Sequence, residues 1–394
     1  MRVAIIGGTG HIGTYLTPQL VEAGHDVLCL TRGLKKPYCP HQAWNSVRHI
    51  TVDREAEEKA GTFGERVASL DPEVVIDLTC YHPDSAEQLV SALRGRIQHF
   101  LHCGTIWTHG HSTEVPTTED APRHPFGDYG IRKLAIERLL LSQARRHNFP
   151  ATLLHPGHLV GAGWNPVNPQ ANFNPDVFAK LAEGQAVCLP NLGMETVHHV
   201  HASDVGQAFL LAMTHRSVAI GESFHIVSPA ALTLRGFAER MSAWFGHPAN
   251  LTFLAWEQWK ETVSEKDARA TWDHIAHSPN CSIAKAQRLL GYAPRYTSLQ
   301  AVQEAVTSLQ IHGSAGRLLS LLASLLNASP AETGSDMKRK LPFTGLMTPC
   351  SSPRRKARFP LVYCYCARMR QDGQTSETCP AVSAALALVN VRWG

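Results

Sequence analysis

The stretch YGIRK places a tyrosine and a lysine, Tyr129 and Lys133, four positions apart. In a helix, which the surrounding sequence predicts, both side chains lie on one face about one turn apart. A free phenol has a pKa near 10, too high for a base at neutral pH, and an ammonium group beside it would lower that pKa. The pair could therefore exchange a proton with a substrate oxygen. Thr105 lies at the end of an earlier predicted strand, 24 residues before Tyr129.

The first turn of the chain is rich in glycine. In MRVAIIGGTGHIG, an apolar run is followed by Gly7, Gly10 and Gly13 at intervals of three. Between a strand and a helix, such glycines permit a tight turn, close approach of a pyrophosphate and close helix packing. The N–H groups at the start of the helix would hold the phosphates. We predict a dinucleotide site whose residues in this turn are Gly7, Thr9, Gly10, His11, Ile12 and Gly13.

The ends of the next two predicted strands bear on the identity of the dinucleotide. The second strand ends at Thr31 with Arg32 after it, where an NAD site usually has an acidic residue for the ribose hydroxyls. An arginine would instead pair with the 2′-phosphate of NADP. Asp53, at the end of the third strand, is placed to meet the adenine amino group. The pattern favours NADP over NAD, and the alternative is that Arg32 is a surface charge that stacks on the adenine.

Strand-like and helix-like stretches alternate over residues 1–161. The strands, such as VAIIG and EVVIDLT, are continuous apolar runs and not alternating patterns. Such runs are typical of strands buried on both faces. They predict an α/β fold with a doubly wound parallel sheet of the Rossmann type, and we assign residues 1–161 to this NAD(P)-binding domain.

The pattern changes twice further along the chain. We expect residues 162–312 to form mainly a smaller C-terminal substrate domain, with the segment 196–228 returning to the first domain. Residues 313–394 sustain no hydrophobic period and hold 11 Lys and Arg against 4 Asp and Glu. We predict a disordered tail there. The alternatives are a localisation patch at PRRKAR and a stretch that is not native protein.

Residues 1–312 resemble the extended short-chain dehydrogenase/reductase superfamily, and within it the NAD-dependent epimerase/dehydratase family. The resemblance rests on GGTGHIG, Asp53, Thr105, YGIRK, HPGHLVG and VHASDV. It implies that Tyr129 is the general acid/base, that Lys133 also holds the nicotinamide ribose, and that Thr105 bonds the substrate oxygen. It places HPGHLVG, with Pro156, beside the nicotinamide.

The resemblance implies an NAD(P)-dependent oxidoreductase that transfers hydride at a secondary alcohol or ketone of a small molecule. Two alternatives remain: a nucleotide-sugar epimerase or dehydratase that retains its NAD, and a non-catalytic NAD(P)-sensing protein. Sugar-nucleotide members usually carry an asparagine where His158 stands. This departure puts a nucleotide-sugar substrate in doubt, and we predict that His158 donates a hydrogen bond to a different substrate.

Histidines gather in two clusters, THGH and VHHVH. No Cys, Asp or Glu completes a convincing tetrahedral set beside them, so we predict no metal site. In the second cluster, the resemblance also implies that Asp204 caps the helix that follows.

The remaining composition excludes several protein classes. No apolar run approaches the roughly 20 residues of a membrane helix, and the strand at the N-terminus leaves no room for a signal peptide. Apart from the tail, no basic face indicates nucleic-acid binding. The ten cysteines show no disulfide spacing over the first 312 residues. We expect a cytoplasmic enzyme with a small-molecule substrate, and a homodimer is compatible with the sequence.

Overall fold

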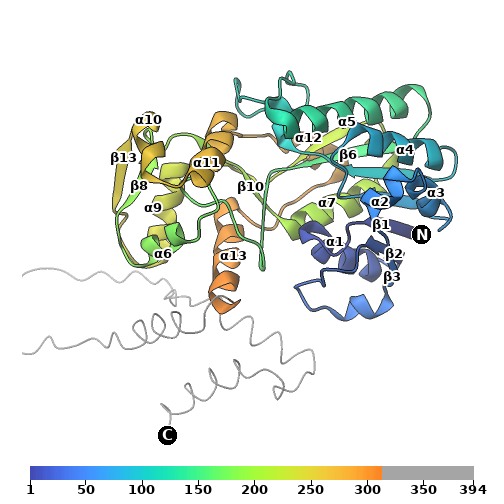
Figure 1. Ribbon diagram of the computed structural model, residues 1–394, viewed down its shortest axis with the longest axis horizontal. Helices are drawn as coiled ribbons and strands as arrows, with labels where there is room; N and C mark the ends of the chain where they lie inside the picture. Colours follow the sequence, from blue (N-terminus) through green and yellow to red (C-terminus); the bar gives the residue numbers. More distant parts are fainter. Residues whose placement is uncertain (313–394) are drawn as a thin grey trace, which may run out of the picture. The chain divides into compact units, whose positions relative to one another are not determined.

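A seven-stranded parallel sheet lies at the centre of the computed structural model, which describes residues 1–312 (Figure 1). The predictions for residues 313–394 lie outside the described residues. The strand order is β11-β6-β5-β4-β1-β2-β3, and every neighbouring pair is parallel. The strands are β1 (Arg2–Ile6), β2 (Asp26–Thr31), β3 (Arg48–Thr51), β4 (Val74–Asp77), β5 (His99–Cys103), β6 (Ala151–Pro156) and β11 (Ser223–Ile226). The predicted α/β fold of the Rossmann type is confirmed.

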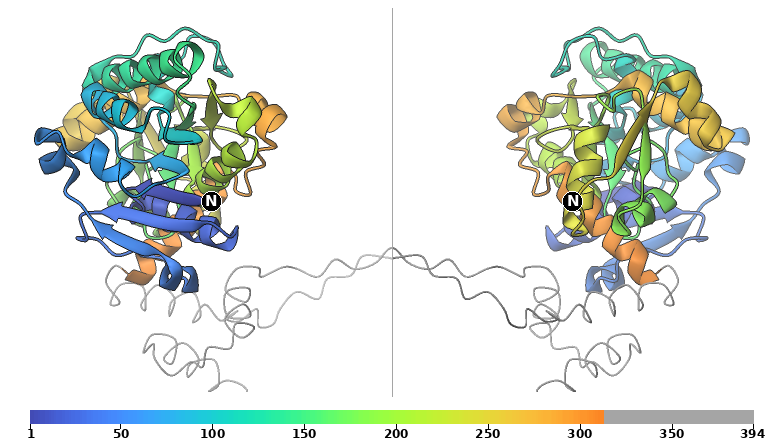
Figure 2. Two further views of the ribbon diagram at one scale, coloured as in Figure 1. Left: turned by 90° about the vertical axis from the view of Figure 1, so that its right-hand side faces the viewer. Right: turned by 90° about the vertical axis from the view of Figure 1, so that its left-hand side faces the viewer.

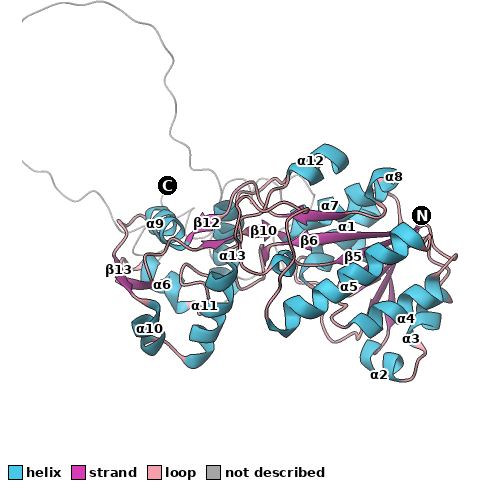
Figure 3. Cartoon of the chain, turned by 90° about the horizontal axis from the view of Figure 1, so that it is seen from above, coloured by secondary structure: helices cyan, strands magenta, loops and turns pink. Residues whose placement is uncertain are grey.

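Helices cover both faces of this sheet, as Figure 3 shows. One face packs against α1 (His11–Glu22) and α7 (Ala202–Thr214) in a shared apolar core. The other face packs against α3 (Phe63–Ala68), α4 (Pro83–Leu93) and α5 (Gly127–Arg146) in a second core. The continuous apolar strands therefore reflect burial on both faces. The shorter helices of this part are α2 (Arg54–Lys59), α8 (Arg216–Ala219) and α12 (Ala284–Leu290), with 3-10 turns η1 (Gln42–Ser46) and η2 (Ile106–His109).

The strand order reverses between β1 and β4. From β1 the chain proceeds outward to β2 and β3, and then returns to β4 on the opposite side of β1. Ligands of open α/β sheets bind beyond the carboxyl ends of the strands at such a switch point. The glycine-rich turn after β1 and the segment after β4 both lie there, so the topology brings the predicted cofactor-binding turn to the position where a dinucleotide binds.

The rest of the described chain forms a third apolar core, built from small elements. Three two-stranded sheets pair β7 (His158–Val160) with β10 (His199–His201), β9 (Thr196–Val197) with β12 (Leu232–Thr233), and β8 (Val187–Pro190) with β13 (Leu251–Leu254). The helices are α6 (Asp176–Ala182), α9 (Leu234–Trp244), α10 (Trp256–Trp259), α11 (Glu265–His277) and α13 (Ser298–His312), with a 3-10 turn η3 (Lys260–Thr262). The opposite views of Figure 2 face the blue N-terminal strands and the yellow and gold segments of this part in turn.

The two parts interleave along the chain. After β10, α7 packs on the central sheet and β11 joins it, and the chain then enters the third core with β12 and α9. Among the described residues, no helix has the length and hydropathy needed to cross a membrane. The six cysteines within the described part are free thiols.

Candidate active site

The turn after β1 has the geometry of a phosphate cradle. Gly7 adopts φ +86°, a conformation that favours glycine, and a Cβ there would lie 2.5 Å from Cγ2 of Thr79. A Cβ on Gly13 would lie 2.3 Å from the carbonyl oxygen of Gly8. Gly10 is the N-cap of α1 and has no side chain to occupy the first N–H groups of the helix. These N–H groups remain available to an anionic group at a helix N-terminus, so the turn fits a dinucleotide pyrophosphate.

The ring of His11, at the start of α1, lies in an aromatic stack. Its centroid is 4.4 Å from that of Trp164 and 5.7 Å from that of Tyr38, and both pairs are stacked. Burial lowers the pKa of His11 to about 3, so the ring is neutral near pH 7. The stack joins the loops that follow β2 and β7 above the first turn of α1. His11 would therefore reach a cofactor through its backbone rather than through its ring.

The predicted ribose and adenine contacts lie at the surface. Thr31 ends β2, and its hydroxyl accepts a hydrogen bond from the backbone of Gly33 at 3.3 Å. Arg32 is exposed beside it. Asp53 is also exposed and uses Oδ1 to cap α2, accepting from the N–H of Ala56 at 3.2 Å. Its other carboxylate oxygen is left for a ligand.

Helix α5 carries Tyr129 and Lys133 to the carboxyl edge of the sheet. The Nζ of Lys133 donates to the carbonyl oxygens of Cys80 and Cys103, both at 2.8 Å. Those carbonyls belong to the segment after β4 and the end of β5, so the buried lysine ties the helix to the switch point. Tyr129, one turn earlier, is 41% exposed. Thr105 caps η2 after β5, and its side chain lies close enough to the Tyr129 hydroxyl to lower the pKa of that group. The three predicted catalytic residues thus lie together.

The charge balance at Tyr129 differs from the expected one. Burial raises the pKa of Tyr129 above its ordinary value, and the nearby side chain of Thr105 opposes this only in part. Burial also lowers the pKa of Lys133. The expected lowering of the phenol pKa by Lys133 is wrong for this structure, because the ammonium is directed at two backbone carbonyls. Near pH 7 Tyr129 is a phenol, which is the form that donates a proton.

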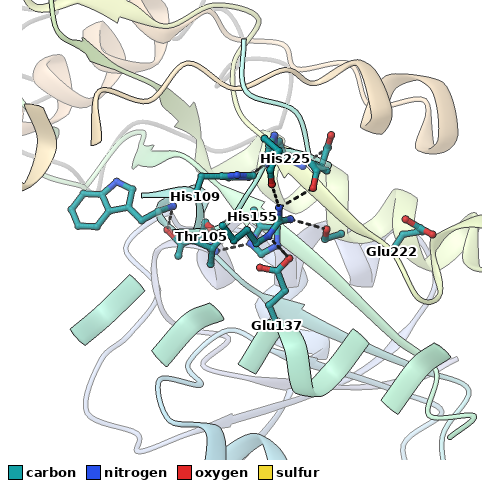
Figure 4. A network of polar contacts seen from close by, with 12 residues as sticks. Thr105, His109, Glu137, His155, Glu222 and His225 are labelled. Atoms are coloured by element: carbon teal, nitrogen blue, oxygen red, sulfur yellow. Dashed lines mark hydrogen bonds and ion pairs between the residues drawn. The ribbon is translucent and has the colours of Figure 1, made fainter. Parts of the chain in front are cut away.

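A buried network supports the position of Thr105 (Figure 4). The backbone N–H of Thr105 donates to Nδ1 of His155 on β6 at 2.9 Å, which leaves the ring proton to Nε2. That Nε2 faces Oε1 of Glu137 on α5 at 3.6 Å, and Glu137 also pairs with Arg123 at 2.8 Å. Burial alone would raise the pKa of Glu137, but His155 and Arg123 outweigh it and lower the pKa to about 2. The network links the strand of Thr105 to the helix of Tyr129.

Aromatic and imidazole rings gather beside Tyr129. The Trp107 ring lies 6.1 Å from Tyr129 and stacks on His277 of α11 at 4.1 Å. We call the following six residues the ring cluster, since each contacts at least one other member ring to ring: Trp107, Phe126, His158, Phe173, His274 and His277. They come from η2, the start of α5, β7, the loop before α6, and α11. The cluster brings the C-terminal part of the chain to the catalytic residues.

His158, the predicted substrate-binding residue, lies inside this cluster. Its Nδ1 accepts a hydrogen bond from the backbone N–H of His198 at 3.2 Å. Burial, and then the neighbouring histidines, lower its pKa well below the usual range. The neutral ring therefore carries its proton on Nε2, which has no hydrogen-bond partner in the described structure. The predicted donor role of His158 is compatible with this geometry. Pro156, the predicted nicotinamide neighbour, ends β6 two residues earlier.

Asp204 does not cap the helix in which it lies. The ring of His201 is the N-cap of α7 and accepts from the N–H of Ser203 at 3.1 Å. Asp204, inside the first turn, accepts from the backbone N–H groups of Arg295 and Tyr296 at 3.1 and 3.2 Å. The expected cap is therefore wrong, because a histidine side chain reaches the helix end and the aspartate instead ties down the segment before α13.

One group of side chains in the described part could hold a metal ion. Ligand atoms of Asp77, Cys80 and His102 lie within 4.8 Å of one another. The carboxylate of Asp77, however, is already paired with Arg54 through two hydrogen bonds of 2.8 and 3.1 Å. The charge of Lys133 also acts on His102. Two positive charges beside the three ligands disfavour a further cation.

The predicted histidine clusters do not form common ligand sets. His109 pairs its Nε2 with Nε2 of His225 at 2.8 Å, while the neighbouring His111 bonds the carbonyl of Ala276. His199 directs Nε2 to the carbonyl of Val167.

Sequence reasoning missed the ring cluster, apart from His158, and the pair of His155 and Glu137. The spacing of Glu137 four residues after Lys133 places it on the same helix face, and that signal could have been noticed. Trp107, His274 and His277 gave no such signal, because their contacts join segments that are far apart in the chain.

Comparisons with known proteins agree with this geometry. The family model described as the NAD dependent epimerase/dehydratase family matches residues 3–226. A 2'-dehydrokanamycin reductase from Streptomyces kanamyceticus is 27% identical over 278 residues, which are 70% of this chain and 76% of the relative. A UDP-glucose 4-epimerase from Streptomyces lividans is 23% identical over 63% of this chain and 82% of the relative. The crystal structure of a UDP-glucose 4-epimerase from Thermotoga maritima with UDP-glucose is 20% identical, with a TM-score of 0.62 over 80% of this chain and 100% of that chain.

Proposed function

The chain belongs to the NAD-dependent epimerase/dehydratase family, a family of NAD(P)-dependent enzymes, and on this premise we propose that it reduces a ketone of a small molecule, or oxidises the corresponding secondary alcohol. The observation that carries the proposal is the convergence of Thr105, Tyr129 and Lys133 at the carboxyl edge of the sheet, beside the glycine-rich turn. Such a reaction needs a proton donor, a hydroxyl that bonds the substrate oxygen and a turn that binds the dinucleotide.

The residues divide the work as follows. When bound, NAD(P) supplies or accepts the hydride at the carbon that bears the substrate oxygen. Tyr129 donates its phenolic proton to the oxygen of the ketone, because burial keeps the phenol protonated near pH 7. Thr105, whose side chain lies beside that phenol, holds the substrate oxygen. Lys133 fixes the helix against Cys80 and Cys103 and lies where it would hold the nicotinamide ribose.

NADP is the proposed cofactor, with NAD as the alternative. Thr31 and the exposed Arg32 follow β2, and neither can repel a 2′-phosphate as a carboxylate would. Gly7, Thr9, Gly10, His11, Ile12 and Gly13 would hold the pyrophosphate, with Asp53 beside the adenine and Pro156 beside the nicotinamide. The protein is proposed to act in the cytoplasm.

Substitution of the proton donor tests the proposal. A panel of cyclic ketones is screened with NADPH, and the best substrate is then used with Tyr129→Phe. We expect turnover to fall at least about a hundredfold, the usual scale of general acid–base help, with NADPH binding unchanged. Tyr296→Phe is the matched control, because Tyr296 stacks on His201 away from α5. Near-normal turnover of Tyr129→Phe would remove Tyr129 from the mechanism.

Relatives named UDP-glucose 4-epimerase favour a second candidate, a nucleotide-sugar epimerase or dehydratase that returns the hydride. Such an enzyme would keep its nucleotide through purification and would consume no free NADPH. Reversible binding of NADPH together with its net oxidation would exclude that candidate. Loss of both activities, with cofactor binding intact, would favour a non-catalytic NAD(P)-sensing protein instead.

A further inference from the structure

The hydrogen-bonding state of three imidazoles on or beside the ring cluster is fixed by the backbone. His158 receives an N–H at Nδ1, so its proton is on Nε2 and that atom is a donor. His277 directs Nδ1 at the carbonyl of Asp273 at 2.6 Å, so its Nε2 is an acceptor. His199 directs Nε2 at a carbonyl, so its Nδ1 is an acceptor. In each ring, therefore, one nitrogen is hydrogen-bonded to the backbone, and this bond determines whether the other nitrogen is a donor or an acceptor.

The second nitrogen of each ring, Nε2 of His158, Nδ1 of His199 and Nε2 of His277, is buried and has no hydrogen-bond partner in the part of the chain that the structure describes. A buried polar group without a partner costs about 1–3 kcal/mol relative to a satisfied one. Three such atoms lie on or beside the ring cluster, since His199 lies 5.9 Å from His158 by ring centroid. One donor and two acceptors match the needs of hydroxyl groups, which both donate and accept, and the ring cluster reaches Tyr129 through Trp107.

The ring cluster carries no positive charge. Burial lowers the pKa of His274 and of His277 to about 4, so both rings are neutral at physiological pH. Within residues 1–309, the cations that lie over aromatic rings contact Phe63, Tyr81, Phe224 and Phe253, none of which belongs to the cluster. A phosphate group offers only acceptor oxygens and negative charge. It would meet two further acceptors here and no cation to offset its desolvation.

Building on the proposed function, we infer that the substrate is a hydroxylated ring compound without phosphate that packs against Trp107. His158, His199 and His277 form hydrogen bonds with its substituents. The flat face of an aromatic ring suits the C–H face of a cyclic substrate and also accepts an amino group through its π system. The three nitrogens then bond the hydroxyl or amino substituents. Nucleotide sugars would bring a diphosphate for which the ring cluster offers no positive charge, so we expect them to bind more weakly.

Binding measurements test the inference without requiring turnover. The NADP-loaded full-length protein is titrated calorimetrically with UDP-glucose and with four phosphate-free ring compounds: methyl glucoside, inositol, kanamycin and a hydroxylated cyclohexanone. We expect saturable binding of at least one phosphate-free compound and at least tenfold weaker binding of UDP-glucose. Tighter binding of UDP-glucose, or binding of none of the four, would overturn the inference.

Variants connect the binding to the three nitrogens. His158→Phe and His277→Phe keep an aromatic ring but remove the donor and one acceptor, and each should weaken binding of the phosphate-free compound at least tenfold. His215→Ala, at the exposed end of α7, is the control and should bind normally. Thermal melting identifies a variant that fails to fold, in which case His158→Gln and His277→Gln replace it. Unchanged binding in both folded variants would overturn the inference.

The result also separates this inference from the proposed function. Turnover of UDP-glucose that depends on Tyr129 would keep the proposed hydride transfer and overturn only the substrate class. Binding of a phosphate-free compound without any NADPH-dependent turnover would keep the substrate class and overturn the hydride transfer.

Discussion

The glycine-rich turn and the ring cluster are two regions of the candidate active site, and they are built in different ways. The turn uses a few consecutive residues after β1, and its shape follows from Gly7 and Gly13, where a side chain would collide with the neighbouring backbone or with Thr79. The ring cluster collects side chains from five separate segments, between Trp107 in η2 and His277 in α11. The turn is local, and the cluster is a product of the whole fold.

The difference suits the proposed roles of the two regions, which are cofactor binding by the turn and substrate specificity by the ring cluster. A cradle made of backbone N–H groups accepts a pyrophosphate whatever substrate accompanies it. A cluster made of side chains from distant loops can change its chemistry without changing the fold. Relatives that share this sheet carry names as different as a 2'-dehydrokanamycin reductase and UDP-glucose 4-epimerases.

Filling the turn should have the largest effect. Gly13→Val places a Cβ 2.3 Å from the backbone oxygen of Gly8, a contact that no rotamer relieves. We expect NADPH binding to fall more than about a hundredfold, or the protein to fail to fold. Gly246→Ala is the control, because nothing lies within 4 Å of its added carbon and the strain of its positive φ costs only about 1 kcal/mol. Calorimetric titration with NADPH and thermal melting measure both effects, and normal binding by Gly13→Val would contradict the cradle.

Acid should destabilise the protein through its buried neutral histidines. Burial lowers the pKa of each of these below the unfolded value near 6.5: His11, His99, His102, His109, His158, His198, His199, His225, His274 and His277. Between about pH 6.5 and 4 the unfolded chain binds more protons, so the free energy of unfolding falls as pH falls and is flat above pH 7. Each histidine contributes up to about 1.4 kcal/mol per pH unit.

Denaturant titrations from pH 8 to 4.5 measure this dependence. His102→Leu should reduce the slope by about one proton, because both ring nitrogens of His102 are buried without a partner. The exposed His215→Ala should leave the slope unchanged. Equal stability at pH 7 and pH 5 would contradict the assignment of these rings as neutral.

Removing the positive charge of Arg32, which follows β2, should weaken the binding of NADPH but not of NADH. Arg32→Ala should weaken NADPH binding by about 1.5–3 kcal/mol, the scale of a charge-assisted hydrogen bond, and leave NADH binding nearly unchanged. Lys59→Ala, an exposed lysine on α2 that pairs with Glu55, is the control. Equal losses for the two cofactors would refute the NADP preference.

Removing His155, whose ring accepts a hydrogen bond from the Thr105 N–H, should have the smallest effect. His155→Leu removes the acceptor of the Thr105 N–H and the ring that faces Glu137. We expect kcat to fall about tenfold, which corresponds to about 1.4 kcal/mol, while the KM for NADPH stays constant. His99→Leu is the control, because His99 is an equally buried histidine of β5 that bonds Thr152. A parallel loss of kcat in both variants would reduce His155 to a structural role.

Much of the fold and part of the site follow from the sequence by itself. The parallel sheet follows from strands that are apolar at consecutive positions, because burial on both faces requires that composition. The cradle follows from glycine spacing, and the shared face of Tyr129 and Lys133 follows from helical geometry. These features depend on interactions between residues that are near one another in the chain, which spacing records directly.

Other features were decided only by the tertiary structure. The sequence suggested that Lys133 would lower the pKa of Tyr129, but the fold directs the ammonium to two carbonyls, and desolvation raises the pKa of the phenol. It also suggested that Asp204 caps α7, where the fold supplies His201 instead. The ring cluster has no local signal at all, because ring contacts and desolvation depend on which distant segments pack together. Burial and long-range packing set both the protonation state of the catalytic residues and the surface offered to the substrate.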